Sequence, residues 1–298
     1  MKHVLLIGGK TSDQDETEIM AGYATYFVDG INNVEASYVH FDELYIAVEP
    51  GRYVVFDTRN QRMLNYYDLI IFRGKIRADS ELAYCVSRLC SINNIPFFND
   101  YSPYRAASKV SQAITFFELN VNFMKTLYSM NNTILRDRTE KELKLPFILK
   151  DSYGAHGNSN YLIRDYTQLD EILEKQKDVK FIAQAFFPNE CDYRIVCIGD
   201  RELVIRRSAH GDSHLNNTSQ GGSAEIVDSS FLPHSIIESG HSISNKLSMG
   251  IAGVDLLYNE ETKDYAFLEV NSQPQLNSGA FPIEKQLLVK DYISSLLA

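Results

Sequence analysis

The chain has 298 residues, of which 44% are hydrophobic and 23% are charged. This ordinary globular composition excludes a disordered, collagen-like or membrane-embedded protein, and the length predicts about two domains. The formal net charge is −10, from 29 basic and 39 acidic residues, and no basic run is present, so we expect no nucleic-acid partner.

The N-terminal apolar run is too short for a signal peptide, because acidic residues follow it at once. No apolar stretch approaches the roughly 20 residues that span a bilayer. We therefore expect a cytoplasmic protein with no membrane partner.

The first hundred residues alternate short apolar strands with helices. Strands are predicted at Val4–Ile7, Val34–Val39 and Leu69–Phe72, helices at Thr17–Asp29 and Ser80–Cys90, and a hairpin at Arg52–Asp57 and Gln61–Leu64. The run Leu69–Phe72 is apolar throughout, which is typical of a strand covered on both faces. Strand–helix–strand alternation predicts a small parallel α/β sheet.

Pro103 and the polar residues around it indicate a domain boundary. Beyond it the pattern becomes α+β, and it begins with a helix at Ser108–Leu119. Two amphipathic helices follow. Thr167 is the candidate N-cap of the first, Gln168–Gln176. The second begins at Ser235, with Glu238 three residues later, a spacing that fits a capping box.

The strongest chemical signal lies near the C-terminus, in two strand-like segments, residues 252–258 and 265–271, joined by a polar turn. Counting outward from the turn places Asp255 opposite Glu269 to within one position. Glu269 and Asn271 share a face, because side chains alternate along a strand. Two carboxylates and an amide oxygen are hard ligands that suit Mg²⁺, which takes its other ligands from water and phosphates. The alternative is a solvated polar face.

A second signal is a strand that ends in Lys150 and opens into a loop with Gly154 and Gly157. Such glycines let backbone N–H groups approach an anion, and the lysine adds a point charge for a phosphate. Alone, the pattern fits a surface turn equally well.

A third signal is a hairpin that turns at Gly199-Asp200. Asp192 and Arg194 share a face of its first strand, and a surface ion pair between them is the simpler interpretation. Arg206-Arg207 ends the return strand and adjoins a long polar loop, residues 208–223.

Together these segments resemble the ATP-grasp superfamily and, within it, the RimK-like group of ribosomal-protein glutamate ligases. The motifs that carry the resemblance are AGVDLLYN with FLEVNSQP, and DYRIVCIGDRELVIRRSA with NNTSQGGSA. The resemblance covers about residues 102–280. It implies a Rossmann-like pre-grasp α/β domain at 1–101, followed by an ATP-grasp domain at 102–298 with a mobile lid subdomain at about 134–184.

The resemblance implies an ATP-dependent carboxylate–amine ligase. Such an enzyme forms an amide through an acyl phosphate, releases ADP and phosphate, and acts on small-molecule, peptide or protein substrates. Two alternatives stay open: a kinase built on the same fold, and a non-catalytic nucleotide-binding protein. A homo-oligomer is also left open.

The resemblance further implies roles for individual residues. Nucleotide-binding positions are Lys109 and Lys150 at the ATP phosphates, the loop glycines Gly154 and Gly157, the hinge residues Gln184, Ala185, Phe186 and Phe187, and Asp192 on the ribose side. Catalytic positions are Arg194, Asn217 and one of Arg206 and Arg207. Metal-binding positions are Asp255, Glu269 and Asn271, which would hold two Mg²⁺ ions, with Mn²⁺ as an alternative.

Two features remain ambiguous. The family commonly has an arginine before the paired glycines, whereas here His214-Leu215-Asn216-Asn217 precedes Gly221-Gly222, so the role of this loop is open. Arg73, Lys75 and Arg77 could gather an acidic substrate or form a solvated basic patch.

Overall fold

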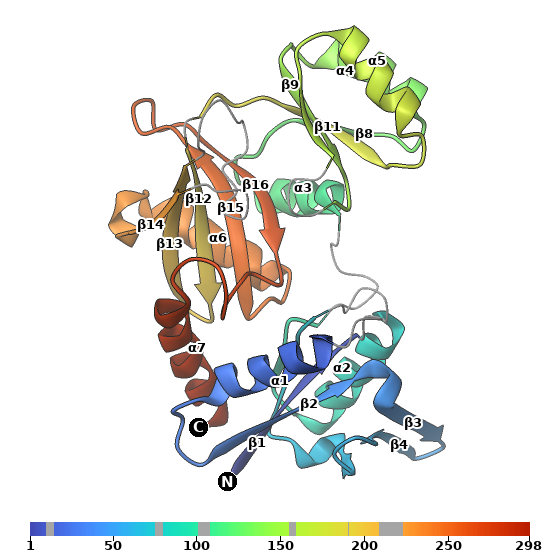
Figure 1. Cartoon of the computed structure of the whole chain (residues 1–298), viewed down its shortest axis with the longest axis vertical. Coiled ribbons are helices and arrows are strands. Elements are labelled where there is room, and N and C mark those ends of the chain that lie inside the picture. Colours follow the sequence, from blue (N-terminus) through green and yellow to red (C-terminus); the bar gives the residue numbers. More distant parts are fainter. Residues whose placement is uncertain (10–14, 75–79, 101–107, 155–158, 190, 209–222) are drawn as a thin grey trace.

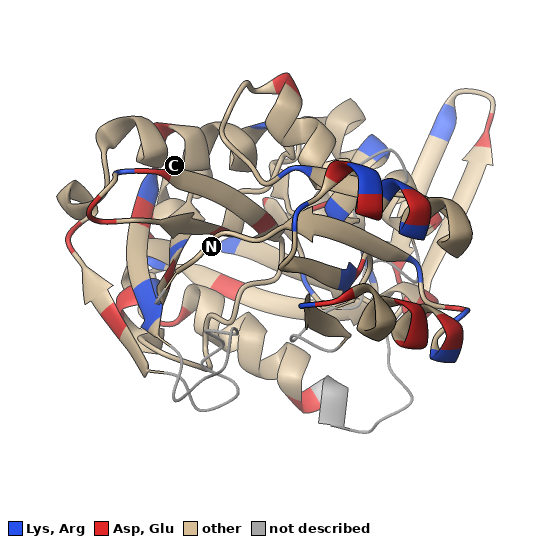
Figure 2. Ribbon diagram, turned by 90° about the horizontal axis from the view of Figure 1, so that it is seen from above, with Lys and Arg blue, Asp and Glu red and all other residues tan. Residues whose placement is uncertain are grey.

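The structure is a computed structural model that describes residues 1–9, 15–74, 80–100, 108–154, 159–189, 191–208 and 223–298. Figure 1 shows an N-terminal part at the bottom, a five-stranded sheet above it, and a four-stranded sheet with two helices at the top. Basic and acidic residues are intermixed rather than gathered by sign (Figure 2). Within the described ranges, no helix has the length and apolar character needed to cross a membrane.

The N-terminal part contains the predicted parallel sheet, with strand order β2-β1-β6-β7. Its elements are β1 (Lys2–Gly8), α1 (Asp15–Val28), β2 (Val34–His40), β6 (Leu69–Phe72), α2 (Ser80–Asn93) and β7 (Phe97–Phe98). Alternate residues of β1 pack toward α1 on one face and α2 on the other. This double coverage explains why β6 and residues 4–7 of β1 are apolar throughout.

A small antiparallel sheet is attached to this part, in the order β3-β4-β5. It consists of β3 (Leu44–Glu49), β4 (Arg52–Asp57) and β5 (Arg62–Met63), flanked by the 3₁₀ turns η1 (Phe41–Glu43) and η2 (Leu64–Tyr66). The predicted hairpin is therefore confirmed, and β3 is a further strand that the sequence did not indicate.

A four-stranded antiparallel sheet of order β10-β9-β11-β8 forms the top of Figure 1. It is preceded by α3 (Lys109–Glu118) and built from β8 (Thr126–Tyr128), α4 (Asn132–Glu142), β9 (Phe147–Asp151), β10 (Asn160–Ile163), α5 (Tyr166–Lys175) and β11 (Phe181–Ala185). The predicted N-cap Thr167 is wrong. Asp165 caps α5 instead, accepting a hydrogen bond from the backbone N–H of Gln168, so the helix begins earlier than expected.

The remaining sheet is antiparallel, in the order β14-β13-β12-β15-β16. Its elements are β12 (Cys191–Ile198), β13 (Arg201–Ser208), β14 (Ser223–Val227), η5 (Ser229–Phe231), α6 (His234–Lys246), β15 (Ile251–Tyr258), β16 (Tyr265–Asn271) and α7 (Pro282–Leu297). One face packs on α6 through an apolar cluster. The predicted capping box at Ser235 is wrong, because the helix starts one residue earlier, after Pro233, with no side-chain cap.

Asn99 joins the N-terminal part to the five-stranded sheet. Its amide donates to the carbonyl oxygens of Ile251 (2.8 Å) and Ser272 (2.6 Å), and its carbonyl oxygen accepts from the N–H of Ile251 (3.0 Å). The side chain is 2% exposed, and its backbone is left-handed, with a φ of 61°. The predicted boundary between residues 101 and 102 lies outside the described residues and stays a prediction, as does the extent of the lid.

We expect Asn99→Ala to lower the free energy of unfolding by about 3 kcal/mol, because three buried backbone groups lose their partners. The measurement is urea unfolding. Asn94→Ala is the matched control, since Asn94 is exposed and also has a positive φ, 55°. Equal losses in the two variants would contradict a role for the Asn99 hydrogen bonds.

Candidate active site

The C-terminal hairpin has the geometry that the sequence predicted. Asp255 lies directly opposite Glu269, and Gly253 lies opposite Asn271. The amide nitrogen of Asn271 lies 3.4 Å from Asp255 Oδ2 and 3.3 Å from Glu269 Oε1. The three predicted metal-binding side chains therefore converge on one point.

A network of ion pairs surrounds Asp255. Arg194, its neighbour across the β12–β15 pairing, donates to both of its oxygens at 2.6 and 2.7 Å. Arg207 lies 2.5 Å from Asp192 and 3.3 Å from Asp255. The expected surface pair between Asp192 and Arg194 is thus replaced by pairs across strands, because the register places opposite charges side by side. We call the sheet face that carries these four residues the site face.

The network sets the protonation of its carboxylates. Burial alone would raise the pKa of Asp255, but Arg194 and Arg207 hold it below its usual value. Burial raises the pKa of Asp192 to about 6, although Arg207 opposes the shift. Near neutral pH, the ionised fraction of Asp255 is therefore larger than that of Asp192.

The structure separates the two neighbouring arginines of β13. Arg207 is 5% exposed and lies on the site face. Arg206 points to the other face, where it contacts Glu225 at 3.0 Å, Glu260 at 3.4 Å and the Cys191 sulfur at 3.4 Å. Strand alternation keeps Arg206 away from the converging carboxylates.

Two lysines meet the site face from the direction of the four-stranded sheet. Lys109, the first residue of α3, donates to the carbonyl oxygen of Gly154 and lies 3.7 Å from Glu269 Oε2. Lys150, on β9, is 8% exposed. Burial lowers its pKa to about 8; Lys109 adds to the lowering, whereas Glu269 and Asp255 oppose it. Both ammonium groups are therefore close to the carboxylates.

The predicted hinge residues lie at the end of β11. Gln184 is buried and donates to the Thr126 hydroxyl at 2.9 Å, and the N–H of Ala185 donates to the Lys125 carbonyl at 3.0 Å. Phe186 and Phe187 follow, half-buried, between β11 and β12. Several predicted residues lie outside the described ranges: Gly157, Asn217 with the rest of its loop, Lys75 and Arg77.

The donor set at the hairpin fits a hard divalent cation. It offers two carboxylates and one amide, and rotating the Asn271 amide would direct its oxygen toward the same point. Asp255 would have to share its oxygens between the cation and the two arginines. In the described part of the chain, no three His, Cys, Asp or Glu side chains are grouped to hold a metal; here the third donor is an asparagine.

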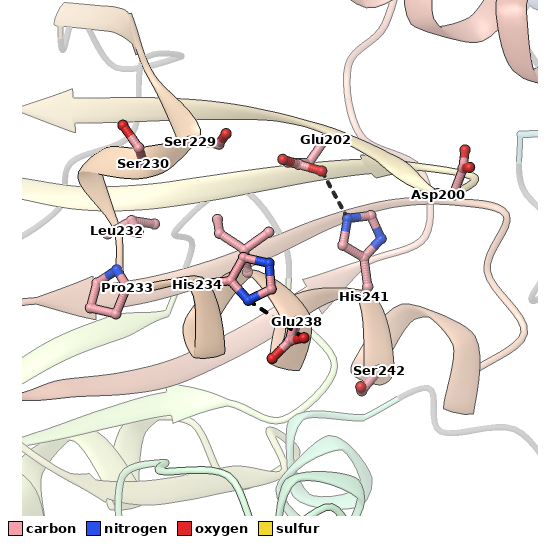
Figure 3. Close-up of a pocket in the computed structure, with 11 residues that line it drawn as sticks. Asp200, Glu202, Ser229, Ser230, Leu232, Pro233, His234, Glu238, His241 and Ser242 are labelled. Atoms are coloured by element: carbon pink, nitrogen blue, oxygen red, sulfur yellow. Dashed lines mark hydrogen bonds and ion pairs between the residues drawn. The ribbon is translucent and has the colours of Figure 1, made fainter.

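A separate pocket of about 730 Å³ lies on the opposite face of the sheet, between β13 and α6. Figure 3 shows His241 directed toward Glu202, and their closest atoms are 3.0 Å apart. None of the predicted site residues lines this pocket. Its size alone therefore does not mark the site that the motifs indicated.

Two buried cations lie beside the site, and sequence reasoning missed Lys285 and did not indicate that Arg73 is buried. Lys285, on α7, is 2% exposed and Arg73, after β6, is 4% exposed. Arg73 donates to the Pro274 carbonyl at 2.8 Å and to the Tyr23 hydroxyl at 3.0 Å. Arg73 is therefore not part of a solvated patch, which was one of the two alternatives for it, and Lys285 belongs to no motif that would have revealed it.

The sequence model of the RimK-like ATP-grasp domain matches residues 113–293 of this chain. No curated protein sequence matches the chain.

Solved structures are similar over the whole length. The macrocyclase MdnC from Microcystis aeruginosa MRC, bound with its precursor peptide MdnA, is 14% identical with a TM-score of 0.65, over 98% of this chain and 99% of that chain. A RiPP-associated ATP-grasp ligase from Chryseobacterium gregarium, in complex with ADP and a leader and core peptide, is 12% identical with a TM-score of 0.66, over 99% and 97%. D-alanine–D-alanine ligase from Bacillus anthracis, complexed with ATP, is 15% identical with a TM-score of 0.68, over 100% and 98%. At these identities the likeness shows a shared fold.

The lowered pKa of Lys150, about 8, predicts a pH-dependent affinity for ATP. The ammonium that would contact the phosphates is lost as the pH rises through this value, so the Kd for ATP should increase by up to about tenfold between pH 7 and pH 9. Titration calorimetry at constant ionic strength measures it. Lys150→Arg should abolish the increase, because arginine stays charged. A wild-type Kd for ATP that does not change with pH would contradict this role. An equal loss of ATP affinity with rising pH in Lys150→Arg would contradict it as well.

Proposed function

Because this chain belongs to the RimK-like ATP-grasp family and is therefore an ATP-dependent ligase, we propose that it joins a carboxylate of a peptide to an amine. The family match and the shared fold confirm the resemblance and the fold class expected from the sequence. The observation that carries the proposal is the convergence of Asp255, Glu269 and Asn271 beside two lysines.

We propose that Lys109 and Lys150 bind the phosphates of ATP. Both lie near Glu269, so a phosphate held by the lysines would be close to the predicted metal ligands. The backbone from Gln184 to Phe187 would bind the adenine. The predicted ribose contact of Asp192 stays a prediction, because its carboxylate is bound to Arg207.

Asp255, Glu269 and Asn271 would hold magnesium, which when bound neutralises charge on the phosphates. The number of ions and the use of Mn²⁺ stay predictions. Arg207 is our candidate for the arginine at the transferred phosphoryl group, since it shares the site face with these residues and Arg206 does not. Asp192 would keep Arg207 in place, and Arg194 would position Asp255.

The proposed ligation proceeds in two steps, phosphoryl transfer and then amide formation. A substrate carboxylate oxygen bonds to the γ-phosphorus, and the bond from that phosphorus to the β-phosphate bridging oxygen breaks, which yields an acyl phosphate and ADP. The amine nitrogen then bonds to the acyl carbon, phosphate leaves with the C–O bond electrons, and the amine loses a proton. Phosphoryl transfer depends mainly on positioning and charge neutralisation, which the lysines and Arg207 can supply.

A peptide substrate is the finer part of the proposal. Its support is the RimK-like family match, together with whole-chain similarity to MdnC and the Chryseobacterium ligase, both solved with peptides. D-alanine–D-alanine ligase has the same fold, so a free amino acid is the alternative substrate, and a substrate panel distinguishes the two.

The test of the ligase reaction measures ADP and phosphate release over a panel of peptides and amines. We expect equal amounts of ADP and phosphate, with a mass-spectrometric product lighter than its two parents by one water. Glu269→Gln should lower the rate at least about 100-fold, because a ligand carboxylate is lost. Glu225→Gln, on the edge strand, is the matched control. Release of ADP together with a phosphorylated product would indicate a kinase. If no peptide–amine pair led to release of ADP, the proposed enzymatic activity would be contradicted.

The two neighbouring arginines provide a second test. We expect Arg207→Lys to lower kcat/KM by about 100-fold, because a fixed donor at the transferred phosphate is lost. Arg206→Lys should stay within about threefold of the wild type. If Arg206→Lys lowered kcat/KM as much as Arg207→Lys, or more, the assignment of the phosphoryl-contacting arginine from its face of the sheet would be contradicted.

A further inference from the structure

A small cavity lies on the site face, between strands β12 and β13 and the loop that joins β16 to α7. Its lining includes three cations, Arg194, Arg207 and Lys285, and the apolar side chains of Val196, Ile205 and Pro274. The cavity measures about 30 Å³, which is room for about two water-sized atoms. It therefore suits a small polar group rather than a whole side chain.

Lys285 is the unusual member of this lining. A lysine is rarely buried unless it is paired. The partners that the described residues provide are the carbonyl oxygens of Gln275 and Ser278, the latter at 3.3 Å. Burial lowers the pKa of Lys285 to about 8, with a further lowering from Arg194 and Arg73, and the exposed Glu284 opposes the shift only weakly. The ammonium thus lies in an environment that favours an added anion.

The charges on the described residues that line the cavity and pair with its lining do not cancel. Its wall carries three cations, and two of them, Arg194 and Arg207, are neutralised by two carboxylates, Asp255 and Asp192. One positive charge remains, and Lys285 carries it. Arg73 adds a second buried cation behind the wall, held by a carbonyl and a hydroxyl group.

We infer that this cavity is the binding socket for a carboxylate of the acid substrate, and that Lys285 is a specificity-determining residue. The inference rests on the proposed ligase function. Two oxygen atoms fill the available room, a single negative charge balances Lys285, and the apolar walls strengthen the attraction by excluding water. A carboxylate on a flexible stem, as in a glutamate or aspartate side chain of a peptide, meets these conditions and reaches the neighbourhood of Arg207.

Gly253 lies against two of the residues that line the socket, Arg194 and Pro274. A Cβ atom at this position would lie 3.3 Å from Arg194 Cδ, 3.3 Å from Arg194 Nε and 3.3 Å from Pro274 Cβ. Gly253→Ala would therefore displace the guanidinium or the proline without changing any charge. It tests the socket independently of Lys285.

The experiment measures ligand binding to the full chain by thermal shift at constant ionic strength. The probes are N-acetyl-glutamate amide, whose side chain ends in a carboxylate, its neutral analogue N-acetyl-glutamine amide, and inorganic phosphate. We expect only the glutamate derivative to raise the Tm of the wild type. Lys285→Met should weaken its binding at least tenfold. Lys290→Met is the matched control, because Lys290 lies on the same helix but pairs with Asp29.

Three results would overturn the inference: no stabilisation of the wild type by the glutamate derivative, wild-type affinity in Lys285→Met, or a Lys285-dependent preference for phosphate over the carboxylate. If Lys285→Met does not fold, Gly253→Ala provides the test instead. Wild-type affinity of that variant for the glutamate derivative would also overturn the inference. ADP release is assayed separately, so carboxylate binding without ADP release would contradict the ligase function and leave binding at the socket intact.

Discussion

The alternating charges of Asp192, Arg207, Asp255 and Arg194 are the constraint on which the site depends. Each is largely buried and each has an opposite charge across a strand boundary. Removing one partner of such a pair leaves an uncompensated charge that costs about 3–5 kcal/mol. The network therefore favours one register of β12, β13 and β15, and it holds Arg207 and Asp255 in position before any substrate binds.

The two faces of the five-stranded sheet have different surroundings because side chains alternate along its strands. One face packs Tyr193, Ile195 and Cys197 against α6 in an apolar cluster. The other face carries the ion pairs, the converging ligands and the socket at Lys285, and it also packs Val196, Ile198 and Ile205 in an apolar cluster with α7. Because successive side chains point to opposite faces, neighbouring residues such as Arg206 and Arg207 can have entirely different surroundings. The same separation explains why the larger pocket beside α6 is remote from the predicted site.

Elements from three parts of the chain complete the site face. The α3 residue Lys109 connects it to the Gly154 loop, α7 contributes Lys285, and Asn99 attaches the N-terminal part close to the Ser272 carbonyl. Lys150 and Lys285 share one physical property, since burial lowers the pKa of both to about 8. Binding an anion would offset the free-energy cost of burying each charged ammonium group. We therefore propose phosphates as the partner of Lys150 and a carboxylate as the partner of Lys285.

The amino-acid sequence was enough to predict the parallel α/β sheet, the C-terminal hairpin and the pairing of Asp255 with Glu269, because strand periodicity and turn position are local properties. It also determined the family, through motifs that lie within continuous segments. The pairing of Asp192 with Arg207 rather than Arg194 could be read only from the folded chain, since it depends on the register between strands. Packing between distant segments also brings Arg73 and Lys285 beside the site face: Arg73 contacts Pro274, 201 residues away, and Lys285 lines a cavity with Arg194 and Arg207. No local pattern records such contacts.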